Sequence, residues 1–247
     1  MPGDARTSTG GSRWRVEHHA RVDSTNRVAL DQARSGAEPG LVVVADHQTA
    51  GRGRLDRRWH APPGSSLLVS VLLPAITGAE GAHRAVVAVA VSLAEAVGDV
   101  AGVDVGLKWP NDLVVGDRKL AGVLAELDGD TVVVGAGCNV NWDHFPPELA
   151  DTATACNLEA GHPVDRDALL DALLSRLDEH LDSPDVLLDA YRARLVTLGR
   201  RVRVERVDGA LEGTASEVTD DGALVVRDDV GAAHAVVAGD VVHLRDA

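Results

Sequence analysis

Residues 47–59 concentrate cationic side chains and glycines in an otherwise acidic chain. They read HQTAGRGRLDRRW, with four arginines and one aspartate, whereas the 247-residue chain has a formal charge of −14. Glycine lets a backbone approach a ligand closely, and the planar guanidinium offers paired donors to a carboxylate or a phosphate. No broad basic surface surrounds the segment, so we expect it to bind a small anion. The alternative is a solvated loop with a chance arginine cluster.

The only two lysines of the chain, Lys108 and Lys119, lie eleven residues apart, whereas 22 arginines serve every other basic position. A lysine retained in such a chain suggests a site that needs a compact ammonium rather than a planar fork. Two surface lysines left by chance are the alternative. Lys108 opens the sequence KWPND, in which Pro110 favours a turn and Asn111 and Asp112 supply polar groups at its mouth.

A third candidate segment, residues 135–142, reads GAGCNVNW at the end of an apolar strand. Its glycines permit close approach and Asn139 would direct an amide into a site, although a glycine-rich strand end with an asparagine turn fits equally well. Cys138 has no neighbouring histidine and is expected to be a small core residue. The ten histidines show no metal-ligand spacing, so the sequence assigns no metal ligands.

Composition narrows the class of protein. With 45% apolar and 25% charged residues, the chain is typical of a globular protein. The negative charge argues against a nucleic-acid partner, and no apolar run approaches the length of a membrane span. Two cysteines make no disulfide framework, and residues 1–12 do not resemble a signal peptide. We therefore expect a cytoplasmic protein without membrane or nucleic-acid partners.

Hydrophobic periodicity predicts two domains after a disordered tail at 1–13. Residues 14–198 should form an α+β domain with a mixed sheet flanked by helices, and 199–247 a small β-barrel of five short strands. Ser24 and Thr25 offer caps for a helix that follows the first strand, and the apolar run 41–45 indicates a strand buried on both faces. The remaining predicted strands are 66–73, 103–109, 113–115, 121–127 and 131–135, and the remaining predicted helices are 80–97, 165–181 and 184–198.

Taken in order, these segments resemble the biotin protein ligases. The matching pieces are Ser24-Thr25-Asn26, the loop 48–59, Lys108–Asp112, Lys119–Gly122, Gly137–Val140 and the terminal barrel. The resemblance runs from about Trp14 to Arg245 and implies the class II synthetase-like catalytic domain of biotin and lipoate ligases, followed by an SH3-like barrel.

The resemblance implies a two-step reaction in one site. Biotin and ATP with Mg²⁺ would form biotinyl-5′-AMP and pyrophosphate, and a lysine of a biotin carboxyl carrier domain would then take the biotinyl group. It implies Lys119, Arg54 and Arg52 as catalytic residues. Biotin would be bound by Ser24, Thr25, Asn26, Gln48, Gly51, Arg52, Gly53, Arg54 and Lys119. The nucleotide would be bound by Arg57, Trp59, Lys108, Asn111 and Asn139.

The sequence departs from the family at two positions and leaves alternatives open. Asp56 stands where the loop usually has glycine, and Cys138 replaces an aliphatic residue. Some family members carry an N-terminal DNA-binding domain; only 13 residues precede Trp14, so we expect a monofunctional ligase. The alternatives are a lipoate or octanoate ligase or transferase of the same fold, and a non-catalytic regulatory binding protein. A homodimer remains possible.

Overall fold

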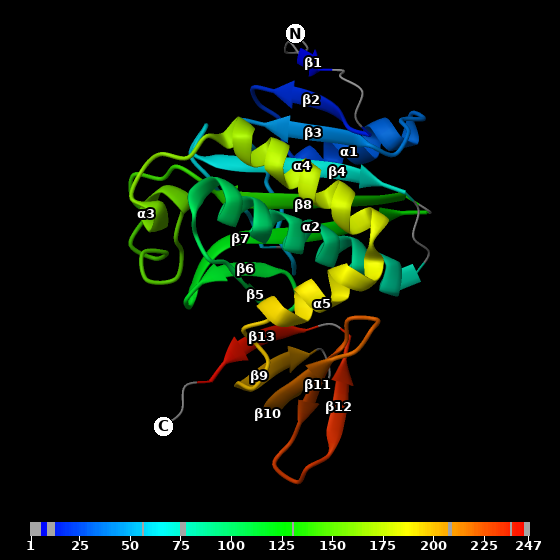
Figure 1. Cartoon of the computed structure of the whole chain (residues 1–247), viewed down its shortest axis with the longest axis vertical. Helices are drawn as coiled ribbons and strands as arrows, with labels where there is room; N and C mark the ends of the chain where they lie inside the picture. The colour runs from blue at the N-terminus through cyan, green and yellow to red at the C-terminus, as the bar shows by residue number, and fades with distance from the viewer. Residues whose placement is uncertain are drawn as a thin grey trace.

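Two β-sheets organise the chain, as the computed structural model shows (Figure 1). The structure describes residues 6–8, 13–55, 57–74, 78–129, 131–206, 209–237 and 239–244. The larger sheet has the strand order β1-β2-β3-β4-β8-β7-β6-β5. Its strands are β1 (Arg6–Ser8), β2 (Arg15–His19), β3 (Leu41–Ala45), β4 (Ser66–Leu73), β5 (Gly106–Lys108), β6 (Asp112–Val115), β7 (Arg118–Asp128) and β8 (Thr131–Asn139).

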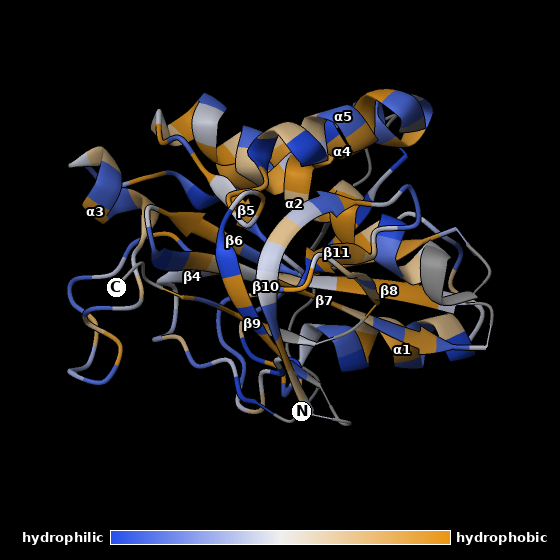
Figure 2. Cartoon of the chain, turned by 90° about the horizontal axis from the view of Figure 1, so that it is seen from below, coloured by the Kyte–Doolittle hydropathy of each residue, from blue (hydrophilic) through white to orange (hydrophobic). Residues whose placement is uncertain are grey.

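The large sheet is mixed, as predicted. β2 and β3 run parallel and are joined by helix α1 (Thr25–Arg34), whereas the other neighbouring strands pair antiparallel. The remaining helices are α2 (Gly78–Ala101), α3 (Cys156–Ala160), α4 (Arg166–Asp182) and α5 (Pro184–Arg194). Figure 2 shows α2, α4 and α5 on one side of the sheet and α1 on the other.

The alternation of side chains along β8 divides its residues between two environments. Val132, Val134, Ala136 and Cys138 belong to the same buried core as the apolar residues of α2. Val133 faces the other way and packs with Ala29 and Leu30 of α1 in a second, smaller core. Gly135 and Gly137 follow on that same side, where the absence of side chains leaves space above the sheet.

The helices begin and end for local reasons. Asp165 caps α4, because its carboxylate accepts hydrogen bonds from the backbone N–H groups of Asp167 and Ala168. Pro184 starts α5 at a position where its missing N–H costs nothing. In α4 the predicted leucine stripe is buried, and it packs against α2. No helix in the ranges that the structure describes is long and apolar enough to cross a membrane.

The C-terminal strands form a separate antiparallel sheet with the order β12-β11-β10-β9-β13. The strands are β9 (Arg201–Arg206), β10 (Gly209–Val218), β11 (Leu224–Arg227), β12 (Ala233–Val236) and β13 (Asp240–His243). Its five strands agree with the SH3-like prediction. No pairing within the described residues joins β12 to β13, so these strands form an open sheet rather than a closed barrel. The proposed boundary between 198 and 199 stays a prediction.

Trp109 fastens the two sheets together. Its indole Nε1 donates to the carbonyl of Gly222 at 3.0 Å, and its backbone N–H donates to Thr197 Oγ1, also at 3.0 Å. Gly222 has a φ of +85°, and a Cβ there would lie 1.8 Å from the ring of His83 on α2. Only glycine therefore allows this turn of the small sheet to close against α2.

Several elements differ from the sequence predictions. Residues 6–8, expected to be disordered, pair antiparallel with β2, while residues 1–5 and 9–12 lie outside the described ranges. β7 starts at Arg118 rather than 121, because Arg118 and Lys119 pair with β6, and β8 continues to Asn139 rather than 135, because Asn139 pairs with Ser66 of β4. Lys119 and Asn139 consequently belong to strands, whose geometry aims their side chains. The last helix ends at Arg194 rather than at 198.

Candidate active site

A cavity of about 650 Å³ lies on the side of the sheet that is opposite to α2. Of the residues predicted for the site, all except Gly51 line this cavity. They are Ser24, Thr25, Asn26, Gln48, Arg52, Gly53, Arg54, Arg57, Trp59, Lys108, Asn111, Lys119 and Asn139. The fold thus brings together four segments that are far apart in the sequence; the individual ligand roles stay predictions.

Residues 51–59 form a hairpin over this cavity. Gly53 N–H donates to the Arg57 carbonyl at 2.7 Å and Trp59 N–H to the Gly51 carbonyl at 3.0 Å, with a bridge between Arg52 and Arg58. A Cβ on Gly51 would lie 2.5 Å from the Trp59 carbonyl oxygen, so the hairpin requires glycine at its base. Gly51 therefore shapes the hairpin rather than lining the cavity. Asp56 lies outside the described residues.

Two glycines make the floor on which Trp59 lies. Gly122 of β7 and Gly137 of β8 are paired directly across the strands. A Cβ on Gly137 would come within 2.7 Å of the Trp59 ring, and one on Gly122 within 3.5 Å of it. A side chain on Gly137 would displace the indole, whereas a Cβ on Gly122 would only touch it, so this glycine pair leaves a flat slot between the hairpin and the sheet that the indole fills.

Lys119 projects its ammonium beside this slot. Nζ lies 2.6 Å from Asp112 Oδ1 and 5.7 Å from the centroid of the Trp59 ring. The Lys119 backbone pairs with another segment, because its N–H donates to the Thr152 carbonyl at 2.7 Å and its carbonyl accepts from Thr154 N–H at 2.9 Å. The backbone bonds and the contact with Asp112 together fix the direction of the side chain, which lines the cavity and is about two-fifths exposed.

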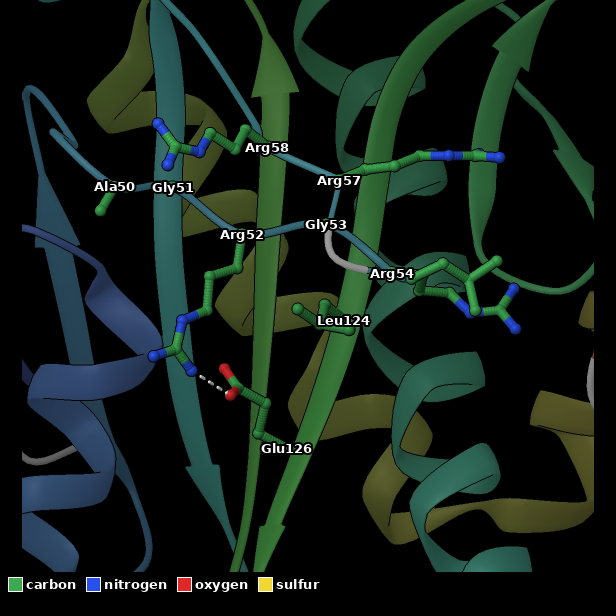
Figure 3. A pocket seen from close by; sticks show the side chains of 10 residues that line it. Ala50, Gly51, Arg52, Gly53, Arg54, Arg57, Arg58, Leu124 and Glu126 are labelled. Carbon is green, nitrogen blue, oxygen red and sulfur yellow. Dashed lines mark hydrogen bonds and ion pairs between the residues drawn. The ribbon is translucent and has the colours of Figure 1, made fainter.

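The arginines of the hairpin leave it in different directions. Arg54 and Arg57 point to one side and Arg52 to the other (Figure 3). An Arg54 Nη1 donates to Asn111 Oδ1 and to the Gly239 carbonyl, each at 3.3 Å, which links the hairpin to the small sheet. Asn111 is in turn fixed by its Nδ2, which donates to the Val123 carbonyl at 2.8 Å. Arg52 instead reaches Glu126 Oε1 at 2.6 Å.

A polar cluster closes the end of the cavity at α1. Gln48 Oε1 accepts from the Thr25 backbone N–H at 2.7 Å and lies 3.1 Å from Thr25 Oγ1. These bonds fix the orientation of the amide and leave Gln48 Nε2 as a donor for a ligand. Ser24 is the N-cap residue of α1 and lines the cavity, and its hydroxyl makes no capping hydrogen bond.

Two of the three predicted asparagine contacts, Asn26 and Asn139, make hydrogen bonds within the protein itself. Asn26 Nδ2 donates to Glu126 Oε2 at 2.7 Å, and Asn26 Oδ1 lies 2.6 Å from the hydroxyl of Ser70. Gly135 permits this packing, because a Cβ there would lie 2.1 Å from Asn26 Oδ1. Asn139 Nδ2 donates to the Thr154 carbonyl at 3.0 Å. Both carboxamides therefore orient neighbouring segments, which their sequence pattern did not indicate.

Sequence reasoning missed two features of the site. Glu126 lies on the same side of β7 as Gly122 and Leu124 and lines the adjoining pocket under the hairpin, and the alternation of the strand could have identified it. Trp142 and Phe145 stack with ring centroids 4.3 Å apart and an interplanar angle of 18°, and both line the cavity. In a chain with so few aromatics, this close pair was a signal available from composition.

Cys138 is a buried core residue. Its side chain is fully buried with Sγ 4.0 Å from Cys156 Sγ, and this neighbouring thiol and burial raise the pKa of Cys138 well above the usual range. A thiol in that state is a poor nucleophile, in agreement with the predicted core role. Among the described residues, no group of three or more His, Cys, Asp or Glu side chains is arranged to hold a metal ion.

Comparisons with known proteins agree with this arrangement. The model of the biotin/lipoate A/B protein ligase family matches residues 19–143, and the model of the biotin protein ligase C-terminal domain matches residues 197–244. A biotin–[acetyl-CoA-carboxylase] ligase of Mycobacterium tuberculosis is 40% identical over 95% of this chain and 91% of its own length.

Further relatives point the same way. The bifunctional ligase/repressor BirA of Bacillus subtilis is 30% identical over 87% of this chain and 70% of its own length. A solved structure of the Aquifex aeolicus biotin protein ligase, in complex with biotin and ATP, superposes with a TM-score of 0.80 at 28% identity and covers 94% of this chain and 99% of that one. The chain therefore belongs to the biotin protein ligases.

Proposed function

We propose that the protein is an ATP-dependent ligase that activates biotin as biotinyl-5′-AMP and transfers it to a lysine of a biotin carboxyl carrier domain. The observation that carries this proposal is one cavity with an uncharged polar end, at Ser24 and Gln48, and a cationic part, at Lys119 and Arg54. Such a cavity suits a ligand with a neutral hydrogen-bonding head and an anionic tail, as in biotin.

The polar end would hold the ureido head of biotin. The urea carbonyl accepts hydrogen bonds, and Gln48 Nε2 and the Ser24 hydroxyl are the donors that the local network leaves available. The apolar ring system would lie beside the Trp59 indole, which itself covers Gly122 and Gly137. The valeryl chain would then direct its carboxylate toward Lys119.

The cationic part suits the first chemical step. The biotin carboxylate attacks the α-phosphorus of ATP, the bond to the bridging oxygen breaks, and pyrophosphate leaves. Two anions must approach each other in this step, and charge grows on the phosphoryl oxygens. Lys119 and Arg54 neutralise that charge from fixed positions, because Asp112 and Asn111 already orient them.

The nucleotide would extend from Lys119 along the rest of the cavity, where Lys108 and Arg57 would contact the phosphates and the Trp142–Phe145 pair offers an apolar wall. ATP is expected to arrive with Mg²⁺, which usually keeps several waters and takes one or two carboxylates together with phosphate oxygens. Asp112 and Glu148 line the cavity and fit that requirement. Bound there, the cation would neutralise phosphate charge.

In the second step the amine of the acceptor lysine attacks the carbonyl carbon of the mixed anhydride, and AMP leaves as an amide forms. No covalent bond to the enzyme is required, which is consistent with the inert state of the Cys138 thiol. The acceptor proposed is the carrier domain of a biotin-dependent carboxylase, as the name of the Mycobacterium relative indicates for that protein.

Isotope exchange tests the proposal. The protein is mixed with Mg-ATP and labelled pyrophosphate, and biotin, lipoate or octanoate is added in separate reactions. We expect label to enter ATP with biotin alone, because only its ureido head matches the donors at Gln48 and Ser24. Exchange with lipoate would assign the chain to the other branch of the fold, and no exchange with any acid would exclude acid activation.

A further inference from the structure

Glu126 occupies a junction between three elements. Its Oε1 accepts from Arg52 Nη1 of the hairpin at 2.6 Å, and its Oε2 accepts from Asn26 Nδ2 of α1 at 2.7 Å. Glu126 itself stands on β7, the strand that carries Lys119. One carboxylate thus connects the hairpin, the first helix and the strand with the reactive ammonium.

The surroundings of this carboxylate favour a lasting ion pair. The Glu126 side chain is 21% exposed and that of Arg52 is 48% exposed, so the pair is partly shielded from water. Glu126 is held on its second oxygen by Asn26, which is itself held by Ser70, and this fixes the carboxylate before Arg52 docks. A fixed acceptor loses little side-chain entropy when the guanidinium arrives.

Arg52 differs from Arg54 and Arg57 in its direction. Its guanidinium points along the sheet to Glu126, whereas Arg54 and Arg57 leave on the opposite side (Figure 3). The part of the cavity beside Lys119 is therefore served by other cations, and Arg52 is committed to a protein carboxylate. This geometry suits a mechanical role for Arg52, whereas the catalytic role expected from its motif stays a prediction.

We propose that Glu126 is a positioning residue that, through its ion pair with Arg52, fastens the hairpin over the cavity and so retains the acyl-adenylate between the two chemical steps. This inference rests on the proposed function for the identity of the intermediate, but the fastening itself is a property of the ligand-free protein. Retention matters because water hydrolyses a mixed anhydride that it can reach.

Glu126→Gln separates the two contacts of the carboxylate. The glutamine oxygen still accepts from Asn26, whereas the ionic attraction to Arg52 is lost. Asp128→Asn is the matched control, because Asp128 lies two residues farther along β7 and pairs with Arg34 of α1, outside the pocket under the hairpin that Glu126 lines. A general weakening of β7 would affect both variants alike.

Hydrogen exchange tests the fastening without any ligand. We expect the backbone N–H groups of Gly53 and Trp59, which close the hairpin, to exchange about fivefold faster in Glu126→Gln than in the unmodified protein. They should keep their rates in Asp128→Asn. Equal rates in Glu126→Gln and in the unmodified protein would overturn the inference, whatever the outcome of the isotope-exchange experiment.

Retention of the intermediate is the second measurement, made on protein that shows biotin-dependent exchange. Enzyme loaded with labelled biotin and ATP is separated from free ligand, and loss of bound adenylate is followed with time. We expect loss to be about fivefold faster in Glu126→Gln, with a KM for biotin within about twofold of the unmodified value. Unchanged retention would overturn the inference.

A double-mutant cycle tests whether Glu126 acts through its ion pair with Arg52. Arg52→Gln, Glu126→Gln and the double variant should lose adenylate at similar rates, because each removes the same ion pair. If Arg52→Gln instead abolished adenylate formation while Glu126→Gln retained it, Arg52 would be a cation for the reacting anions and the proposed role for the pair would be wrong.

Discussion

The two sides of strands β7 and β8 are packed in different ways. On the helix side, Val132, Val134, Ala136 and Cys138 fill a continuous core with α2 and α4. On the cavity side, the same strands present Gly122, Gly135 and Gly137, and the residues that occupy the space come from elsewhere: Trp59 from the hairpin and Asn26 from α1. The helix side of these strands is therefore filled by their own side chains. On the cavity side, glycines leave room for side chains from other segments.

This difference teaches where tolerance to substitution should lie. A packed apolar side tolerates exchanges between apolar residues of similar volume. On the cavity side, a single methyl group displaces a residue brought from another segment. Substitutions of similar size on adjacent residues should thus affect stability on one side and activity on the other.

The largest effect is expected at the ammonium of the cavity side. Lys119→Arg conserves charge, but the planar fork cannot occupy the position of Nζ between Asp112 and the Trp59 ring. We expect biotin-dependent pyrophosphate exchange to fall by about 100-fold with the melting temperature unchanged. Activity close to that of the unmodified protein would show that any cation suffices there.

A matched pair on neighbouring residues tests the comparison directly. The added Cβ of Gly137→Ala would lie 2.7 Å from the Trp59 ring and should reduce exchange activity about tenfold with little change in unfolding free energy. Cys138→Ala, one residue along, should lower the unfolding free energy by about 1 kcal/mol and leave the activity of folded protein unchanged. The reverse outcome would contradict the assignment of the two sides.

The smallest expected effect is a pH dependence of stability at His243 of β13, which lies close to Lys108 at the edge of the cavity side. His243 is half-buried, and its pKa is lowered to about 4 by burial first and then by the nearby charges of Lys108 and Arg200. The guanidinium of Arg200 can only donate, so His243 Nδ1 accepts at 3.3 Å and Nε2–H faces Thr197. The folded protein therefore keeps a neutral ring.

The sign of the pH dependence follows from that pKa. Between pH 6.5 and about 4 the unfolded chain binds a proton at His243 that the folded chain does not bind, so stability falls as pH falls through this window. Because water reaches half of the ring, we expect a loss of about 1 kcal/mol. Denaturant unfolding at several pH values would detect it. His243→Gln should remove this component, and an unchanged slope would assign it to other groups.

Local sequence was sufficient for the elements whose causes are local. The leucine stripe of α4 and the apolar run of β3 predicted buried elements, because periodicity and hydrophobicity act over a few residues. The alternation of glycine with arginine in the hairpin, and the rarity of lysine in this chain, pointed to the cavity. The contact between Arg52 and Glu126, 74 positions apart, has no such local signature.

The sequence pattern alone predicted most of the cations, glycines and amides that line the cavity, and the class of ligand they suit. Tertiary packing assigned each of them its task. Asn26 and Arg52 carry the residue types of ligand contacts, yet Glu126 engages both, and Gly122 and Gly137 act through the ring that lies on them. The physical reason is that composition sets the available chemistry, whereas hydrogen bonds have direction and short range, so a partner is chosen only when the fold brings it within reach.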